Sequence, residues 1–296
     1  MIQTVKLLTP YDLITEAYRR FKLAKPKLTY GHGTDNAWDE ACSLVLGTLH
    51  HSYTISQKKL SSKLSPHQRK ILLEHIEKRI KQRIPIPYLT QEAAFAGMSF
   101  YVDKRVLIPR SPLGELILRR FKPWLHRMPM RHLLDLCTGS GCIAIACAKM
   151  FPHCQVDASD ISSDALKVAQ INIKKHRVQK RVRLYQGNLY RPLPIKRYDL
   201  IISNPPYVTQ QEMAHLPKEH RHEPRLALTA GKDGLKMIKQ IIKEAPHYLK
   251  PNGVLIVEVG SQKAIEHAFP NIPFMWLATG SETVDIFLLH RKNIAV

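Results

Sequence analysis

The chain of 296 residues carries 45 Lys and Arg against 24 Asp and Glu, a net charge of +21, and 44% of its residues are hydrophobic. This length suits one or two domains with hydrophobic cores, and the composition excludes disordered and collagen-like proteins. The positive charge favours a polyanionic partner, above all nucleic acid or a ribonucleoprotein. The bases gather in two segments, nine of them in 58–83 and six in 174–183. A solvated basic face without a partner is the alternative interpretation.

The start of the chain lacks the apolar run and cleavage site of a signal peptide, and no apolar stretch reaches the ~18 residues that a membrane helix needs. We therefore expect a cytoplasmic protein with no membrane partner. The cysteines are odd in number and scattered, which argues against a disulfide framework. Their spacing does not suit a zinc knuckle either. We expect buried thiols at Cys42, Cys137, Cys142, Cys147 and Cys154.

The first part of the chain predicts a small helical domain over residues 1–88. Thr9–Asp12 provides a capping hydroxyl, a proline at the first helical position and a carboxylate three residues after the cap. Apolar residues at helical spacing then predict a second helix over 37–50. Ser65–Gln68 repeats the start signal for a further helix, which the prolines beginning at Pro85 should end.

The pattern changes after residue 88. A short β-hairpin around Gly97 is expected in a linker over 89–111. From 112 to 296, strands and helices alternate, which predicts an α/β fold with a seven-stranded, mainly parallel, Rossmann-like sheet and helices on both faces. The expected strands are 131–136, 155–158, 182–185, 198–203, 254–259, 272–277 and 283–289, the last two pairing antiparallel at the edge. The expected helices are 143–150, 164–176 and 235–249.

A glycine-rich turn, Asp135–Gly141, joins the first of these strands to its helix. Glycines there let backbone amides approach a ligand closely. The turn lacks the third glycine of a dinucleotide site and the lysine of a phosphate loop. Asp160, just past the second strand, can accept both hydroxyls of a ribose, and Asn188, after the third, can pair with an adenine edge. The three elements together fit an adenosine without a pyrophosphate, whereas each alone also fits a tight turn or a helix cap.

The tetrapeptide Asn204–Tyr207 follows the fourth strand. A planar amino nitrogen is a poor nucleophile because its lone pair is delocalised. The side-chain oxygen of Asn204 and the carbonyl of Pro205 can accept both of its protons, and the prolines hold these acceptors in place. Tyr207 can stack on the flat face of an amide or base. The alternative is an ordinary Asn-Pro turn after a strand.

The two motifs, Asp-x-x-x-Gly-x-Gly and Asn-Pro-Pro-Tyr, resemble those of amino-group methyltransferases, which act on DNA or RNA adenine or on protein glutamine. The segments 106–110 and 222–228, Glu115 and Gly231-x-Asp233-Gly234 look like the HemK-like protein glutamine methyltransferase family. One branch of that family acts on peptide-chain release factors and another on the third protein of the large ribosomal subunit. Ser111-Pro112 and Cys137 resemble the ribosomal-protein branch.

The resemblance implies a methyltransferase sheet that binds S-adenosylmethionine and methylates the side-chain amide nitrogen of a glutamine in a large-subunit ribosomal protein, without a metal. The residues it implies for the cofactor are Asp135, Cys137, Thr138, Gly139, Ser140, Gly141, Asp160, Asn188 and Asn204, with Phe100 and Arg110 closing the pocket from the linker. Those for the substrate are Asn204, Pro205, Pro206 and Tyr207, of which Asn204, Pro205 and Tyr207 are expected to be catalytic.

Three other functions remain open from the sequence. The closest rival is glutamine methylation of a release factor, and the next is methylation of adenine in nucleic acid. The third is a non-catalytic assembly factor that binds ribosomal particles and retains the fold. We expect the helical domain to recognise the substrate, with the bases of 58–83 placed against ribosomal RNA in an assembly intermediate.

Overall fold

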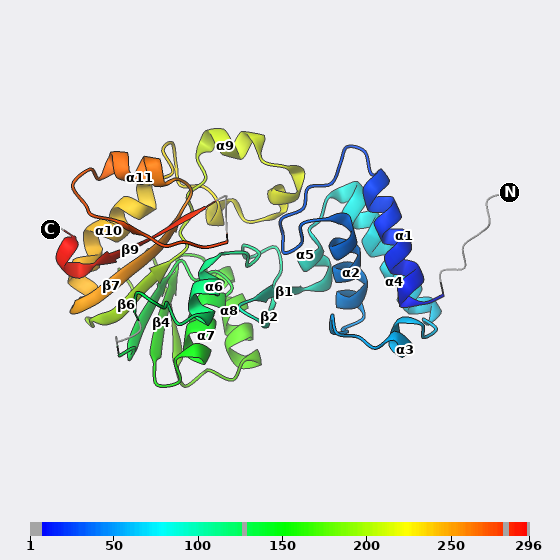
Figure 1. Ribbon diagram of the computed structural model, residues 1–296, viewed down its shortest axis with the longest axis horizontal. Helices are drawn as coiled ribbons and strands as arrows, with labels where there is room; N and C mark the ends of the chain where they lie inside the picture. The colour runs from blue at the N-terminus through cyan, green and yellow to red at the C-terminus, as the bar shows by residue number, and fades with distance from the viewer. Residues whose placement is uncertain (1–7, 126–128, 281–283, 295–296) are drawn as a thin grey trace. The chain divides into compact units, whose positions relative to one another are not determined.

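The computed structural model describes residues 8–125, 129–280 and 284–294, which form two compact units (Figure 1). The helical unit extends to Ala93 and also contains Pro217–His222 from much later in the chain. The sheet unit consists of Ala94–Leu216 and the residues from Glu223 onward. The helical unit therefore includes a segment that lies outside the domain 1–88 expected from the sequence.

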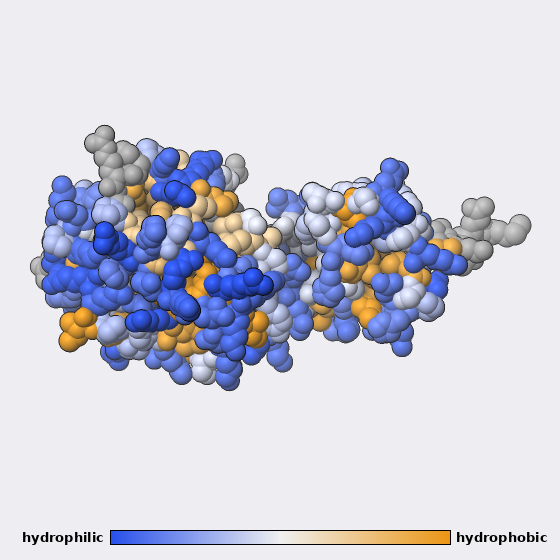
Figure 2. Space-filling view, turned by 90° about the horizontal axis from the view of Figure 1, so that it is seen from below, coloured by the Kyte–Doolittle hydropathy of each residue, from blue (hydrophilic) through white to orange (hydrophobic). Residues whose placement is uncertain are grey.

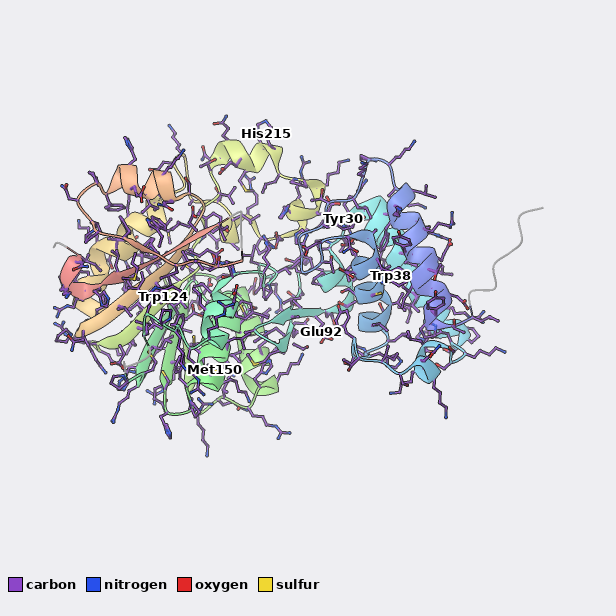
Figure 3. The ribbon with its side chains drawn as sticks, viewed as in Figure 1. Tyr30, Trp38, Glu92, Trp124, Met150 and His215 are labelled. Atoms are coloured by element: carbon purple, nitrogen blue, oxygen red, sulfur yellow. The ribbon has the colours of Figure 1, made fainter. Side chains whose placement is uncertain are left out.

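The helical unit begins its helices where the sequence predicts. Thr9 and Asp12 form a capping box at the first helix, and Ser65 and Gln68 form another at the fourth. Asn36 caps the second helix, which carries Trp38 (Figure 3). The ring of Trp38 meets that of Tyr18 edge-on. The helices are α1 (Pro10–Leu23), α2 (Ala37–Thr48), α3 (Gln57–Leu60), α4 (Pro66–Glu77), the π-helical continuation η1 (Lys78–Gln82), α5 (Ile86–Thr90) and the 3-10 turn η2 (Lys218–His222).

The helix that starts at Pro66 ends before the prolines that the sequence suggests as its stop. It continues to Gln82, and Arg83 then takes a left-handed conformation with φ 62°. A new short helix, α5, follows and contains Pro87 in its first turn, where a proline is tolerated. The core of the unit packs the apolar faces of α1, α2 and α4 around Leu13, Leu44 and Leu72, all fully buried.

The sheet unit contains a seven-stranded sheet in the order β5-β4-β3-β6-β7-β9-β8. The first five of these strands are parallel, and β7, β9 and β8 pair antiparallel at the other edge. This confirms the predicted seven-stranded, mainly parallel sheet. The strands are β3 (His132–Leu136), β4 (Gln155–Asp160), β5 (Val182–Gln186), β6 (Tyr198–Ser203), β7 (Leu249–Val259), β8 (Met275–Trp276) and β9 (Asp285–His290).

Two expected strands differ in extent. β7 begins five residues earlier than predicted, and β8 keeps only two residues of the predicted 272–277. The predicted start of the last strand, Thr283, lies outside the described residues. The hairpin of β1 (Glu92–Phe95) and β2 (Met98–Tyr101) is present, and the amide of Asn172 bonds both backbone groups of Tyr101.

Successive residues of each central strand face opposite apolar layers. Leu133 and Leu200 belong to one core and Leu134 and Ile201 to the other. Helices cover both faces, which explains why β3 and β6 are mostly apolar. The helices α6 (Leu113–Leu118), α7 (Cys142–Met150) and α8 (Ser163–Lys175) lie on one side of the sheet, and α10 (Lys236–Tyr248) and α11 (Gln262–Ala268) on the other (Figure 1). The remaining helical segments of this unit are α9 (Gln210–His215), η3 (Arg225–Ala227) and η4 (Arg291–Asn293).

The visible surface is mostly hydrophilic in both units, with scattered apolar side chains (Figure 2). Within the described ranges, none of the helices has the length and apolarity that crossing a membrane would require. All five cysteines are free thiols, of which Cys142, Cys147 and Cys154 are buried and Cys42 and Cys137 are half-buried.

Candidate active site

A cavity of about 290 Å³ lies at the carboxyl ends of the parallel strands. In open α/β sheets this edge is where ligands bind, because the loops after neighbouring strands meet there. The cavity is close to the lower limit of small-molecule sites. Six of the residues singled out in the sequence line it, and they come from the loops after four strands: Cys137, Gly139, Asp160, Asn188, Asn204 and Pro206.

The glycine turn after β3 needs unusual backbone angles. Gly139 and Gly141 have φ of 53° and 79°, and Cys137 also has a positive φ, 59°, which is strained for a residue with a side chain. At Gly141 a Cβ atom would lie 3.1 Å from that of Ala169, so this glycine allows α7 to pack closely on α8. Ser140 is buried, and its carbonyl accepts a bond from Asn172. Gly139 and Cys137 thus form the cavity wall, while Gly141 and Ser140 support it.

Asp135 stabilises the glycine turn through hydrogen bonds. Its carboxylate is fully buried and accepts bonds from the Thr138 hydroxyl at 2.6 Å and the Ala144 amide at 3.1 Å. Burial raises the pKa of Asp135 to about 7. Its other oxygen, Oδ1, is buried without a hydrogen-bond partner among the described residues. Asp135 and Thr138 therefore hold the loop in shape and do not line the cavity.

Asp160 and Asn188 both line the cavity. The carboxylate of Asp160 accepts bonds from the backbone amides of Gly139 and Ser162, both at 2.9 Å. Burial raises its pKa, and these amide bonds oppose that rise. The Oδ1 atom of Asn188 is buried without a partner among the described residues. A buried acceptor with no partner is costly unless a ligand satisfies it. An adenosine with a free ribose edge and an amino group fits this donor and acceptor set.

The tetrapeptide after β6 reaches the same cavity. Asn204 and Pro206 line it, Pro205 is buried and Tyr207 is half-buried. The Tyr207 hydroxyl donates to Oε1 of Glu258 at 3.1 Å. Residues from both parts of the predicted site, the part that fits an adenosine and the part that accepts the protons of a substrate amino group, thus line one cavity.

Two residues that the sequence interpretation placed at the pocket lie elsewhere. Phe100 is fully buried in the core, with its ring against those of Phe95 and His176. Arg110 makes a bidentate ion pair with Glu223, with N–O distances of 2.6 and 3.0 Å. Neither lines the cavity. The residues that reach it from this part of the chain are Arg105, Val106 and Leu107.

Glu258 is a site residue that the sequence interpretation missed. It is 2% exposed at the end of β7, and the hydroxyl of Ser111 donates to its second oxygen, Oε2. Burial raises the pKa of Glu258 to about 7, while bonds from Ser111 and Tyr207 and the nearby charge of Arg110 oppose that rise. The signal in the sequence is a single acid in the otherwise apolar run of residues 254–259.

Comparison with known proteins gives results of three kinds. Residues 115–219 match the family described as "Methyltransferase small domain". Two curated proteins named "Ribosomal protein uL3 glutamine methyltransferase" match nearly the full chain. The protein from Bordetella pertussis (strain Tohama I) is 45% identical over 291 residues, which is 98% of this chain and 97% of that protein. The protein from Burkholderia pseudomallei (strain K96243) is 44% identical over 295 residues, which is 97% of this chain and 95% of that protein.

Among solved structures, the hMettl16 catalytic domain in complex with MAT2A 3′UTR hairpin 1 is similar in fold. The two chains are 15% identical, with a TM-score of 0.51 over 82% of this chain and 86% of that one. At this identity the similarity concerns the fold alone.

Proposed function

The chain belongs to the ribosomal protein uL3 glutamine methyltransferase family, and we propose that the cavity at the strand ends is its site for S-adenosylmethionine and the glutamine side chain. The protein is an S-adenosylmethionine-dependent protein-glutamine N-methyltransferase that acts on a ribosomal protein of the large subunit. The observation that supports the site most strongly is that Asp160, Asn188 and Asn204, from three different loops, line one cavity.

The cofactor, when bound, supplies a methyl group activated by the positive charge on its sulfur. The residues for its adenosine are two acceptors whose side chains belong to the cavity lining. Asp160 accepts the ribose hydroxyls, and the Oδ1 atom of Asn188 accepts the adenine amino group. Gly139 lets the backbone approach the ligand, and Asp135 keeps that turn in place from beneath.

The remaining residues act on the glutamine. Its amide nitrogen has two protons, and Asn204 Oδ1 and the carbonyl of Pro205 accept them in the positions that the rigid turn fixes. Held in this way, the nitrogen would be oriented for in-line attack on the methyl group that the cofactor supplies, which lowers the entropic part of the barrier. One of its two protons would leave the nitrogen as the N–C bond forms. Tyr207 covers the flat face of the amide.

The substrate is tested by offering labelled S-adenosylmethionine with free uL3, with a release factor and with adenine-containing DNA in separate reactions. We expect label on a glutamine of uL3 alone, identified by mass spectrometry of the modified peptide. Label on the release factor would contradict the assignment to the ribosomal-protein branch. Label on the DNA would contradict glutamine as the target.

We also propose that the basic segment 58–83 of the helical unit contacts ribosomal RNA when the substrate is part of an assembly intermediate. Arg79 and Arg83 are buried inside the unit and cannot take part. The other seven bases of the segment lie at the surface, exposed or half-buried. Four of them, Arg69, Lys70, Lys78 and Lys81, line a hollow of about 830 Å³ along α4, together with Glu74 and Glu77.

Neutralising three exposed bases, Lys59, Lys63 and Lys70, to Gln is expected to weaken methylation of a large-subunit precursor particle several-fold at moderate salt. Each lost phosphate contact should also lower the slope of log affinity against log salt by about 0.7–0.9. Methylation of free uL3 should not change. The matched control neutralises three exposed lysines of the sheet unit: Lys243, Lys263 and Lys292. Equal activity of both triple variants on the particle would contradict an RNA contact by this segment.

A further inference from the structure

Three residues distant in sequence hold Tyr207 at three different points. Its hydroxyl donates to Glu258, as described above. Its ring lies against Gly260, where an added Cβ would come within 3.0 Å of the ring atom Cδ2. Its carbonyl oxygen lies beside Gly234, where an added Cβ would come within 2.5 Å, and Gly234 also has a φ of 70°. Ring, hydroxyl and backbone of Tyr207 are therefore all fixed, and this accounts for Gly234 in the Gly231-x-Asp233-Gly234 motif.

Glu258 connects this arrangement to the linker. Its Oε2 accepts the Ser111 hydroxyl, and the same hydroxyl oxygen accepts the amide of Leu113 at the start of α6. One buried carboxylate thus receives the Ser111 hydroxyl on one oxygen and the Tyr207 hydroxyl on the other.

We propose that Glu258 is a positioning residue, whose carboxylate holds the hydroxyl of Tyr207 and so fixes the ring of Tyr207 beside the substrate amide. The inference rests on the proposed role of Tyr207. Glu258 does not line the cavity and acts through Tyr207. Its loss should therefore affect turnover much more than cofactor binding.

The test is Glu258→Gln, which keeps the volume and removes the charge. The fold should tolerate it, because glutamine is nearly isosteric with glutamate and removes a charge whose burial is costly. We expect kcat to fall by about 10- to 100-fold, the size of effect that a misplaced catalytic group produces. The affinity for S-adenosylhomocysteine, measured by calorimetry, should stay within twofold. A second variant, Tyr207→Phe, removes the hydroxyl that donates to Glu258. Because Glu258 and Tyr207 act as a unit, the loss of kcat in the double variant should be smaller than the product of the two single losses.

The pH profile provides a readout that a purely structural role would not change. The groups facing Glu258 are Ser111, Asn204 and Tyr207, with the charge of Arg110 nearby, and on β9 its partner is the uncharged Ile286. The pKa of Glu258 is raised to about 7, so the carboxylate takes up a proton as the pH falls through that value. Activity of the wild-type protein should fall on this acid side, and the Glu258→Gln profile should lack that step.

The matched control is Asp199→Asn, another buried carboxylate of the sheet unit, which accepts the amides of Arg131 and His132 at the opposite end of β6 from Asn204. It should lower the melting temperature and leave kcat unchanged. The inference is overturned if Glu258→Gln keeps wild-type kcat, if its loss in kcat comes with an equal loss of cofactor affinity, or if the losses with Tyr207→Phe simply multiply. Asn204→Ala is assayed in parallel: if that variant stays active, the proposed site itself fails, and if only Glu258→Gln stays active, the site stands without this inference.

Discussion

Replacing Asn204 with alanine is expected to reduce the rate of methyl transfer to glutamine by about 10²- to 10³-fold, the usual effect of removing one preorganised hydrogen-bonding group from an active site. The alanine removes the acceptor for one proton of the substrate nitrogen and leaves the strand and the turn in place. The loss should appear in single-turnover reactions with saturating labelled S-adenosylmethionine, where cofactor binding and product release do not limit the rate.

The controls separate chemistry from folding and from binding. Asn271→Ala, an exposed asparagine of the same unit, should behave like the wild-type protein. The Asn204→Ala variant should retain its affinity for uL3, measured by sedimentation or calorimetry. Full methylation by this variant would mean that another group orients the amide. If Asn204→Ala binds uL3 as the wild-type protein does and also replaces the wild-type protein fully in ribosome assembly, the non-catalytic assembly factor is the better interpretation.

The sheet could be predicted from the sequence because the signals for its strands lie within short segments of the chain. The strands β3, β6 and β7 contain apolar runs of the right length, and the shorter β4 and β5 alternate with predicted helices and end before turn signals. Parallel strands bring their carboxyl ends to one edge, so residues that follow strands are expected to converge. This is why the sequence alone predicts that Asp160, Asn188 and Asn204 lie together.

The features that the sequence did not reveal depend on contacts between distant residues. Glu258 lies 147 residues from Ser111 and 51 from Tyr207, and no local pattern connects them. Phe100 was assigned to the pocket by resemblance alone, and the side chain packs into the core instead. A motif can therefore identify which strand end carries chemistry, but the supporting residues depend on how the strands pack.

The sequence also does not reveal that the segment 217–222 belongs to the helical unit. It follows the tetrapeptide loop in sequence, and no change in composition marks it as part of another unit. The structure places Glu219 in this unit because its carboxylate pairs with two buried arginines, Arg79 at 3.0 Å and Arg83 at 3.4 Å. Both arginines belong to the basic segment that sequence alone assigns to the surface.

Replacing Arg79 with methionine is expected to cause the largest loss of stability of any single change in the helical unit, about 3–5 kcal/mol. The Arg79 side chain is fully buried between Glu40 and Glu219, and it also donates to the carbonyl of Thr29 at 2.7 Å. Methionine fills much of the volume but leaves two buried carboxylates, of which only Glu219 retains a cation, Arg83. The measurement is urea unfolding with peptide-resolved hydrogen exchange, in which α2 and α4 should lose protection and the sheet should not.

The loss of stability caused by replacing Arg79 should be larger at high pH than at low pH. Burial raises the pKa of Glu40 to about 7 even with Arg79 beside it, so the folded protein binds a proton there more tightly than the unfolded chain does. A group of this kind favours folding at low pH, and that contribution disappears as the pH rises through its folded pKa. Without Arg79 the pKa rises further, so the variant should be destabilised more at pH 8 than at pH 5.5.

Adding Glu40→Gln to the Arg79 variant should restore part of the lost stability, because it removes one of the stranded charges. Arg19→Met is the matched control, since Arg19 is 60% exposed and pairs with Glu16 only at the surface. It should leave the unfolding midpoint unchanged. A similar effect of the Arg19 and Arg79 variants would show that the buried ion network does not hold residues 217–222 in the helical unit. A large loss confined to α2, α4 and that segment would show that it does.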